Sequence, residues 1–428
     1  MSNYAICCKG STFIQWQEVI ITLVTKHIQI SPIVLTYTTS IYELQHLLSH
    51  VLPYFTCFVS PPTECNKEYV KDVLKLTRSL EPDGFCSTIW GILTGSDLQC
   101  ALNIAKHQAP ITIERVLSNC PFPINKCISG TSYSEINKNC CTCKPSDSIQ
   151  PIEKPCTDNL AKYLHEDLSN EKIDLLITSA HASEHDWRIG YQFDGGKFID
   201  TKNQLFAKYT DGSIHQVSST HPKVYIAAGN CLMGSILPDS CMALSWLNSC
   251  SIMQMVGYTV PTWFGYGGWG VLKYFIEMSG KYSLSEAFFS NLQTMLYCIQ
   301  DNKDPNIVKG CLHDSEVIAF YGDPALDSRL QLPKEGVTLS HKYELTVASK
   351  TPWIIKVKTN SSGSWDCDEG DDKATDPGRP PIYVFPRRLK KWNILKGNVM
   401  VTSMFALFKL FGKFAKDEEY EAIIEEIA

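Results

Sequence analysis

The sequence lacks an uninterrupted apolar run long enough to cross a membrane. Its most apolar N-terminal stretch, residues 19–24, is ended by Lys26 and His27, whereas a transmembrane helix needs about 20 predominantly apolar residues. The N-terminus also lacks the basic, apolar and small-residue regions of a signal peptide, because Lys9 and Glu18 interrupt it. We therefore expect no transmembrane span, and the missing leader favours a cytoplasmic location.

Concentrated positive charge is also scarce. The chain has 39 Lys and Arg against 45 Asp and Glu, a formal net charge of −6, and its one short basic cluster, residues 387–391, lies among apolar residues. Nucleic-acid-binding proteins usually concentrate basic residues on one face, so we expect no nucleic-acid partner. The glycine cluster at residues 265–270 lacks the Gly-Lys-Ser/Thr ending of a phosphate-binding loop.

Cysteine is abundant, at 18 residues, but the spacing of a disulfide framework or of a paired zinc site is lacking. Most cysteines stand singly in apolar stretches, so reduced buried thiols are expected, which again favours the cytoplasm. The one dense group, residues 140–143, has Cys127 and Cys156 nearby but no second Cys-x-x-Cys. A structural metal and a cysteine-rich surface loop both stay open there.

Two segments of the chain contain the residues of a thiol catalyst. An apolar run, residues 173–178, precedes His181, and a second, residues 223–227, precedes Cys231. Such runs predict parallel strands buried on both faces, whose carboxyl ends share one edge of the sheet. An imidazole beside a thiol is the pair that thiolate catalysis needs. A buried structural cysteine is the alternative, although the flanking glycines favour an exposed turn.

The His-Ala-Ser-Glu segment at 181–184 and the Ala-Gly-Asn-Cys segment at 228–231 resemble the caspase-like cysteine peptidases and, among them, the gingipain branch. Three further segments are similar to that branch and occur in the same order: residues 69–95, 256–263 and 320–324. The resemblance covers about residues 50–330. It implies a parallel sheet flanked by helices in two subdomains, and the activity of a cysteine endopeptidase.

The resemblance also assigns roles to individual residues. It implies Cys231 as nucleophile, His181 as general base, and the backbone N–H groups of Cys231 and Ala182 as the oxyanion hole. The family usually has glycine after this histidine, so Ala182 departs from the pattern. Glu184 is expected to orient the imidazole, with Asp186 as a second candidate. The substrate pocket is expected to be lined by Tyr258, Thr259 and Trp263.

Alternating apolar runs and amphipathic segments predict an α/β protein with a parallel sheet, followed by a small C-terminal β segment and a terminal helix. The expected divisions are an N-terminal segment of unclear role (1–48), a first α/β subdomain (49–127), a cysteine-rich loop or insertion (128–158), a catalytic α/β subdomain (159–332), a β-rich segment (333–395) and an amphipathic helical tail (396–428). The apolar side of this tail could pack on the β segment, or could dock on a partner or a membrane surface.

No cofactor is expected at the catalytic site. The acidic segment at residues 366–372 could hold a structural Ca²⁺, but it lacks the twelve-residue calcium-loop pattern, and a solvated acidic turn is the alternative.

The expected function is a cysteine endopeptidase that acts on a peptide or protein substrate through a His181/Cys231 dyad. A catalytically weak or inactive binding or scaffold protein with the same fold is the main alternative, favoured by Ala182 and by the additions at both ends. A thiol-dependent enzyme that acts on a different amide is a third.

Overall fold

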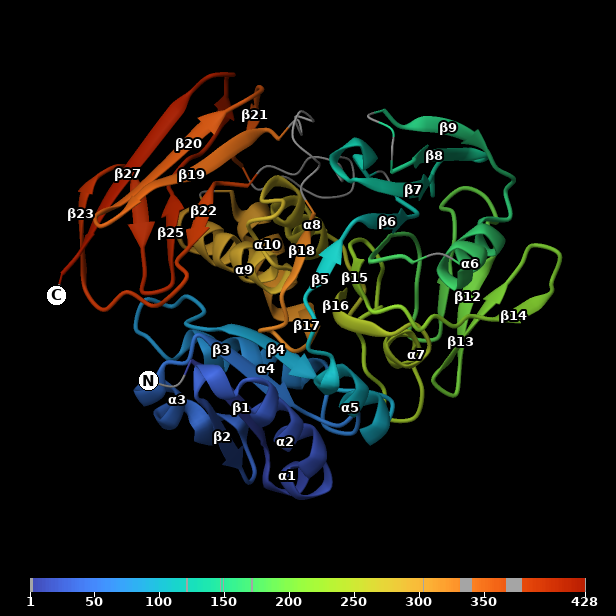
Figure 1. Ribbon diagram of the computed structural model, residues 1–428, viewed down its shortest axis with the longest axis horizontal. Coiled ribbons are helices and arrows are strands. Elements are labelled where there is room, and N and C mark those ends of the chain that lie inside the picture. Colours follow the sequence, from blue (N-terminus) through green and yellow to red (C-terminus); the bar gives the residue numbers. More distant parts are fainter. Residues whose placement is uncertain are drawn as a thin grey trace.

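The computed structural model describes residues 3–427, apart from residues 121, 147, 149, 171, 303, 332–340 and 367–378. The protein is an α/β protein built on a mixed, mostly parallel sheet of 12 strands, with several small antiparallel sheets in the C-terminal region (Figure 1). The strand order of the large sheet is β2-β1-β3-β4-β17-β16-β15-β10-β6-β7-β8-β9. The predicted α/β class is confirmed.

Five mutually parallel strands form the first half of the sheet. They are β1 (Tyr4–Lys9), β2 (Pro32–Tyr37), β3 (Phe55–Val59), β4 (Ile89–Leu93) and β17 (Ile318–Gly322). The connecting helices are α1 (Gly10–Gln15), α2 (Gln17–Lys26), α3 (Gln45–Val51), α4 (Lys67–Arg78) and α5 (Leu98–Lys106), with short 3₁₀ turns at Ile28–Ile30 and Ile41–Leu44. Because β1 and β2 join this half, residues 3–48, whose role the sequence left unclear, belong to the same part of the large sheet as β3 and β4.

The second half of the sheet runs in the opposite direction, because β16 and β17 pair antiparallel where the halves meet. Its parallel strands are β16 (Ile252–Tyr258), β15 (Lys223–Ala227), β10 (Leu175–Thr178), β6 (Arg115–Ser118) and β7 (Ser129–Tyr133). Its helices are α6 (Leu160–Asn170), α7 (Met242–Ser249), α8 (Tyr266–Glu277), α9 (Leu284–Asp301) and α10 (Pro305–Val317). The carboxyl ends of β6, β10, β15 and β16 therefore share one edge, where a ligand site is expected.

The cysteine-rich segment, predicted as a loop or insertion, contains strands. Its described residues form β7, β8 (Cys140–Lys144) and β9 (Ile152–Pro155), which pair in sequence and extend the edge of the large sheet, after a 3₁₀ turn at Ile124–Lys126. Cys127, Cys141 and Cys143 are buried. The segment therefore has a buried side that its polar composition did not indicate.

The chain between the end of β10 and the start of β15 forms a small antiparallel sheet that the sequence did not predict. Its strands are β11 (Asp186–Arg188), β12 (Lys197–Thr201), β13 (Gln204–Lys208) and β14 (Ile214–Gln216). A separate parallel pair joins β5 (Ile111–Ile113) to β18 (Ser328–Leu330). The small sheet begins five residues after His181, so it stands beside the edge at which the candidate dyad was predicted.

The C-terminal region is made of antiparallel strands, as predicted for residues 333–395, and α8, α9 and α10 lie between these strands and the middle of the large sheet (Figure 1). The strands are β19 (Tyr343–Lys350), β20 (Trp353–Thr359), β21 (Gly363–Ser364), β22 (Ile382–Val384), β23 (Trp392–Lys396), β24 (Val399–Val401), β25 (Phe405–Phe408), β26 (Lys413–Phe414) and β27 (Glu419–Glu426).

The predicted helical tail at residues 396–428 is wrong. Four strands replace it, and the apolar residues Phe405–Phe408 are buried as β25, paired with β22 and β24. Short apolar runs do not distinguish a strand from a buried helix, and strand pairing decided the outcome here. The proposed docking of a helical face on a partner or a membrane loses its basis.

No helix in the described part of the chain is long and apolar enough to span a membrane. The acidic segment predicted as a Ca²⁺ candidate lies, apart from Asp366, outside the described residues.

Candidate active site

His181 stands in a tight turn just beyond the end of β10. Ser179 before it is held by Asn119, whose Oδ1 accepts the Ser179 N–H at 3.0 Å, and by Trp187, whose indole N–H donates to the Ser179 carbonyl at 2.9 Å. Ala180 has a φ of 96°, a region that non-glycine residues rarely adopt. The chain then reverses, and the Arg188 N–H donates to the His181 carbonyl at 2.9 Å, leaving the imidazole exposed.

Cys231 stands in the corresponding turn beyond β15. Leu232 next to it has a φ of 58°, and its N–H donates to the Val260 carbonyl at 3.2 Å. The Cys231 side chain is partly exposed, with Sγ 3.9 Å from the carbonyl oxygen of Thr262. Among the described cysteines most are buried, so the exposed turn that the flanking glycines predicted distinguishes this thiol from them.

Asn230 joins the two turns. Its Oδ1 accepts the Thr178 hydroxyl at 2.5 Å, and its Nδ2 donates to the Ala180 carbonyl at 3.0 Å. Asn230 is fully buried, and Thr178 and Ala227 are direct partners in the parallel β10–β15 ladder. The residues that precede His181 and Cys231 are therefore tied across neighbouring strand ends.

Two backbone N–H groups at this edge belong to the residues expected to form the oxyanion hole. Within the described residues, neither the Cys231 N–H nor the Ala182 N–H donates to a protein acceptor. Ala182 instead faces Trp187 in an isolated antiparallel bridge. The positive φ of this turn falls on Ala180 and not on Ala182, so alanine after the histidine needs no left-handed backbone in this loop.

Neither of the two acidic residues that follow the histidine is hydrogen-bonded to its imidazole in the described structure. Glu184 accepts the Met242 N–H through its backbone carbonyl at 2.6 Å, and no hydrogen bond between its carboxylate and His181 is found among the described residues. Burial alone would raise the pKa of Asp186, but the Ser183 hydroxyl at 2.7 Å and Lys197 at 3.0 Å lower it. The structure therefore does not bring Glu184 or Asp186 to the imidazole.

The neighbour of the His181 ring is Tyr191, which sequence reasoning missed. The two ring centroids are 4.9 Å apart and the planes meet at 83°, an edge-to-face arrangement. The Tyr191 hydroxyl lies 3.3 Å from Ser179 Oγ, and its backbone N–H donates to the Glu135 carbonyl at 2.8 Å. Tyr191 follows a short strand of ordinary composition, so the sequence carries no signal that would have selected it.

The residues predicted to line the substrate pocket divide into two groups. Tyr258 and Thr259 are buried; Tyr258 Oη donates to Asp314 at 2.9 Å and accepts the Gly268 N–H at 2.8 Å, and Thr259 Oγ1 donates to the Val317 carbonyl at 3.0 Å. Both therefore hold the end of β16 in place. Trp263, on the loop after them, is 73% exposed, and it is the one of the three with side-chain surface available to a ligand.

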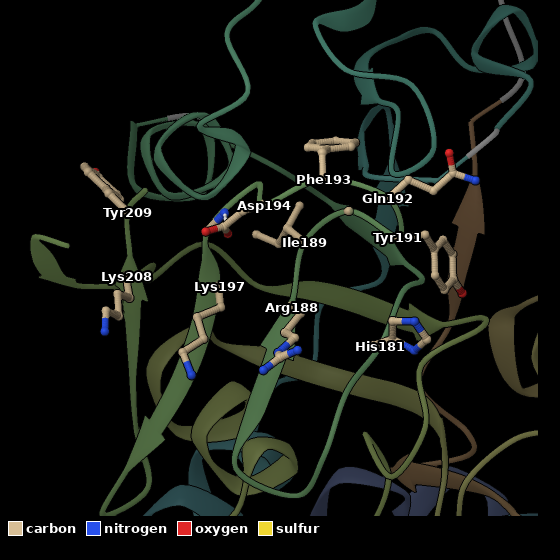
Figure 2. A pocket seen from close by; sticks show the side chains of 12 residues that line it. His181, Arg188, Ile189, Tyr191, Gln192, Phe193, Asp194, Lys197, Lys208 and Tyr209 are labelled. Carbon is tan, nitrogen blue, oxygen red and sulfur yellow. Dashed lines mark hydrogen bonds between the residues drawn. The ribbon is translucent and has the colours of Figure 1, made fainter. Parts of the chain in front are cut away.

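A cavity of about 600 Å³ opens beside His181, between the turn and the small sheet (Figure 2). It is lined by His181, Arg188, Ile189, Gly190, Tyr191, Gln192, Phe193, Asp194, Gly196, Lys197, Lys208 and Tyr209. His181 is the one predicted site residue among them. A ligand in this cavity would therefore extend from the imidazole along the small sheet.

No protein-family model, curated protein or solved structure matches the chain. The described residues also contain no group of three or more His, Cys, Asp or Glu side chains arranged to hold a metal ion.

Proposed function

We propose that the protein is a cysteine endopeptidase of the gingipain-like, caspase-like type, with Cys231 as nucleophile and His181 as its base. The observation that carries the proposal is the link made by Asn230, which ties the turns before His181 and Cys231 together at the carboxyl edge of β10 and β15. The two parallel halves of the large sheet support the two-subdomain arrangement that the resemblance implies.

The residues present account for each step of amide hydrolysis. The Cys231 thiolate would attack the scissile carbonyl carbon, forming a C–S bond, while the π-electron pair moves to the oxygen. The free N–H groups of Cys231 and Ala182 would stabilise that oxyanion. As the C–N bond breaks, the His181 imidazolium gives its proton to the leaving amine. Water then attacks the thioester, His181 accepts the water proton, and Cys231 leaves as the thiolate.

In this proposal, groups other than a carboxylate position the His181 imidazole. Tyr191 packs edge-to-face on the ring, and the Arg188 N–H fixes the His181 carbonyl. Glu184 stays a candidate for substrate contact or for helix support at the start of α7, where its carbonyl accepts the Met242 N–H. This arrangement supports a Cys/His dyad rather than a triad.

The test compares wild type with Cys231→Ala on a mixed peptide library at neutral pH, under reducing conditions and with calcium supplied. Cys140→Ala is the matched control, because Cys140 is another exposed thiol, on β8. Cleavage by wild type and by the control that is lost in Cys231→Ala is the expected result. No cleavage by folded wild-type protein would overturn the proposal in favour of a binding or scaffold protein.

A further inference from the structure

Three cationic residues face one another across the small sheet beside His181. Arg188 on β11 is the direct partner of Lys197 on β12, and Lys197 is the direct partner of Lys208 on β13. Direct cross-strand partners point to the same face, and like charges placed opposite one another destabilise a sheet. Figure 2 shows the three side chains extending in the same direction from neighbouring strands. We call Arg188, Lys197 and Lys208 the basic row. Because their mutual repulsion destabilises the sheet, sheet stability does not explain why these three charges lie together.

Few negative charges offset the basic row. Lys197 Nζ lies 3.0 Å from Asp186 Oδ2, and the charge of Arg188 also helps to lower the pKa of Asp186. Arg188 and Lys208 are exposed, and neither forms a close ion pair with a described residue. All three line the cavity, whose one acidic lining residue, Asp194, accepts the Gly196 N–H at 3.0 Å. The cavity therefore presents an excess of positive charge in a protein whose net charge is −6.

The basic row starts at the candidate catalytic base. Arg188 is hydrogen-bonded through its backbone to His181, and Lys197 and Lys208 follow one and two strands further away. Neighbouring strands are about 4.8 Å apart, so the row spans roughly 10 Å, which is the length of about three residues of an extended peptide. Tyr191, at the His181 end of the cavity, would pack against the peptide where it leaves the dyad.

We infer that the basic row binds an acidic segment of the peptide substrate, a few residues away from the scissile bond. This inference rests on the proposed endopeptidase function, because it is the dyad that makes a peptide the occupant. Two or three carboxylates on alternate or successive substrate residues would pair with Arg188 and Lys208 and share Lys197 with Asp186. The acidic net charge of the protein disfavours a long polyanion such as nucleic acid, which makes a short acidic segment the better fit.

Binding is tested in the Cys231→Ala protein, so that no cleavage intervenes. The probes are two fluorescein-labelled decapeptides that differ only in an Asp-Glu-Asp or an Asn-Gln-Asn segment. The variant is Arg188→Gln/Lys208→Gln. The matched control is Lys67→Gln/Lys75→Gln, which removes the same charge from exposed positions of α4 in the other half of the sheet.

The row variant is expected to bind the acidic peptide about three- to tenfold more weakly, as for the loss of two partly screened ion pairs. The control variant is expected to keep the affinity, and the preference for the acidic peptide should shrink as salt is raised. The row variant should also unfold at a urea concentration no lower than that of the parent, because it loses like-charge repulsion, so weaker binding would not reflect unfolding.

The outcomes separate this inference from the proposed function. Equal affinity of parent and row variant for the acidic peptide would overturn the basic row as a binding site, even if the wild type cleaves peptides. Tighter binding of a single-stranded oligonucleotide, lost in the row variant, would overturn the peptide assignment. Loss of acidic-peptide binding in the row variant, with no cleavage by wild type, would support the site while refuting the peptidase.

Discussion

Ala180 and Leu232 both have a positive φ, 96° and 58° respectively. Ala180 comes directly before His181, and Leu232 comes directly after Cys231. A non-glycine residue in such a conformation costs about 1–3 kcal/mol, and such residues cluster at functional sites. The hydrogen bonds of Asn230 to Thr178 and Ala180 oppose this strain. At the scale of single residues, the candidate site thus depends on a buried amide that is not itself expected to react.

Asn230→Ala tests this dependence. The change removes one hydrogen bond from the Thr178 hydroxyl, which keeps its contact with the Tyr225 hydroxyl at 2.7 Å, and leaves the buried Ala180 carbonyl without its amide donor. The free energy of unfolding should therefore fall by about 1–3 kcal/mol. Because Asn230 would no longer connect the two turns, a peptide electrophile should label Cys231 more slowly. The decrease in rate should exceed the decrease in the fraction of folded protein. Urea unfolding and mass spectrometry of the labelled protein measure the two effects.

Asn248→Ala is the comparison for Asn230→Ala. Asn248 is exposed on α7 and donates one amide hydrogen bond, to the Asn203 carbonyl at 2.9 Å. Its replacement should cost less stability and leave Cys231 labelling unchanged. Equal labelling rates in the two variants would show that Asn230 does not position the thiol.

At the scale of elements, the first turn of α8 supports the Cys231 turn from behind. A Cβ on Gly268 would overlap the carbonyl oxygen of Ala228 at the end of β15, so the helix and the strand end can approach closely only because this residue is glycine. The helix start is also held by Asp314 of α10, whose carboxylate accepts the Gly267 N–H at 2.9 Å. Burial raises the pKa of Asp314 to about 6.

Gly268→Ala is expected to push α8 away from β15. Overpacking of this kind costs about 1–3 kcal/mol, and the displacement of residues 228–231 should lower the reactivity of Cys231. Gly10→Ala is the control, because a Cβ there meets only the Tyr37 carbonyl at 3.8 Å and the substitution should change stability by less than about 1 kcal/mol. Thermal unfolding and thiol labelling of both variants are the measurements, and equal effects in the two would contradict the packing argument.

Elements with long apolar runs were predictable from the sequence, and short or mixed ones were not. The run at residues 223–227 coincides with β15, and the run at residues 173–178 contains β10. The small sheet was not predicted because its strands are only three to five residues long. Charged residues such as Arg188, Lys197 and Lys208 also do not indicate a strand. Tyr191 could not be selected, because its contact with His181 depends on that same small sheet.

At the scale of the whole molecule, the N-terminal segment is fastened to the seam where the two halves of the sheet meet. Asp323, directly after β17, is fully buried and accepts the Tyr4 hydroxyl at 2.9 Å. Lys26 Nζ and His27 Nε2, at the end of α2, each lie 2.7 Å from its other carboxylate oxygen. The Gln254 side chain on β16 donates to the Asp323 carbonyl at 2.8 Å. One buried residue thus connects β1 and α2 through its carboxylate, and β16 through its backbone carbonyl, to the end of β17.

Asp323→Asn should therefore loosen the N-terminal segment as well as the seam. Removing one partner of a buried ion pair costs about 3–5 kcal/mol, because Lys26 would keep its charge without the carboxylate. Hydrogen exchange should accelerate in β1, α2 and β2 beyond the rest of the sheet. Asp239→Asn, at an exposed position, is the control and should leave both stability and exchange unchanged.

The pH dependence gives this prediction a definite sign. Burial by itself would raise the pKa of Asp323, but the charge of Lys26 and the hydrogen bond from His27 lower it well below its usual range. A lowered folded pKa stabilises the protein fully above the ordinary carboxyl pKa of about 4, and this contribution is lost as the pH falls below that value. The stability difference between wild type and Asp323→Asn, measured by urea unfolding, should therefore be constant near neutral pH and shrink below about pH 4. A difference that grows on acidification would show that the cluster does not hold an ionised carboxylate.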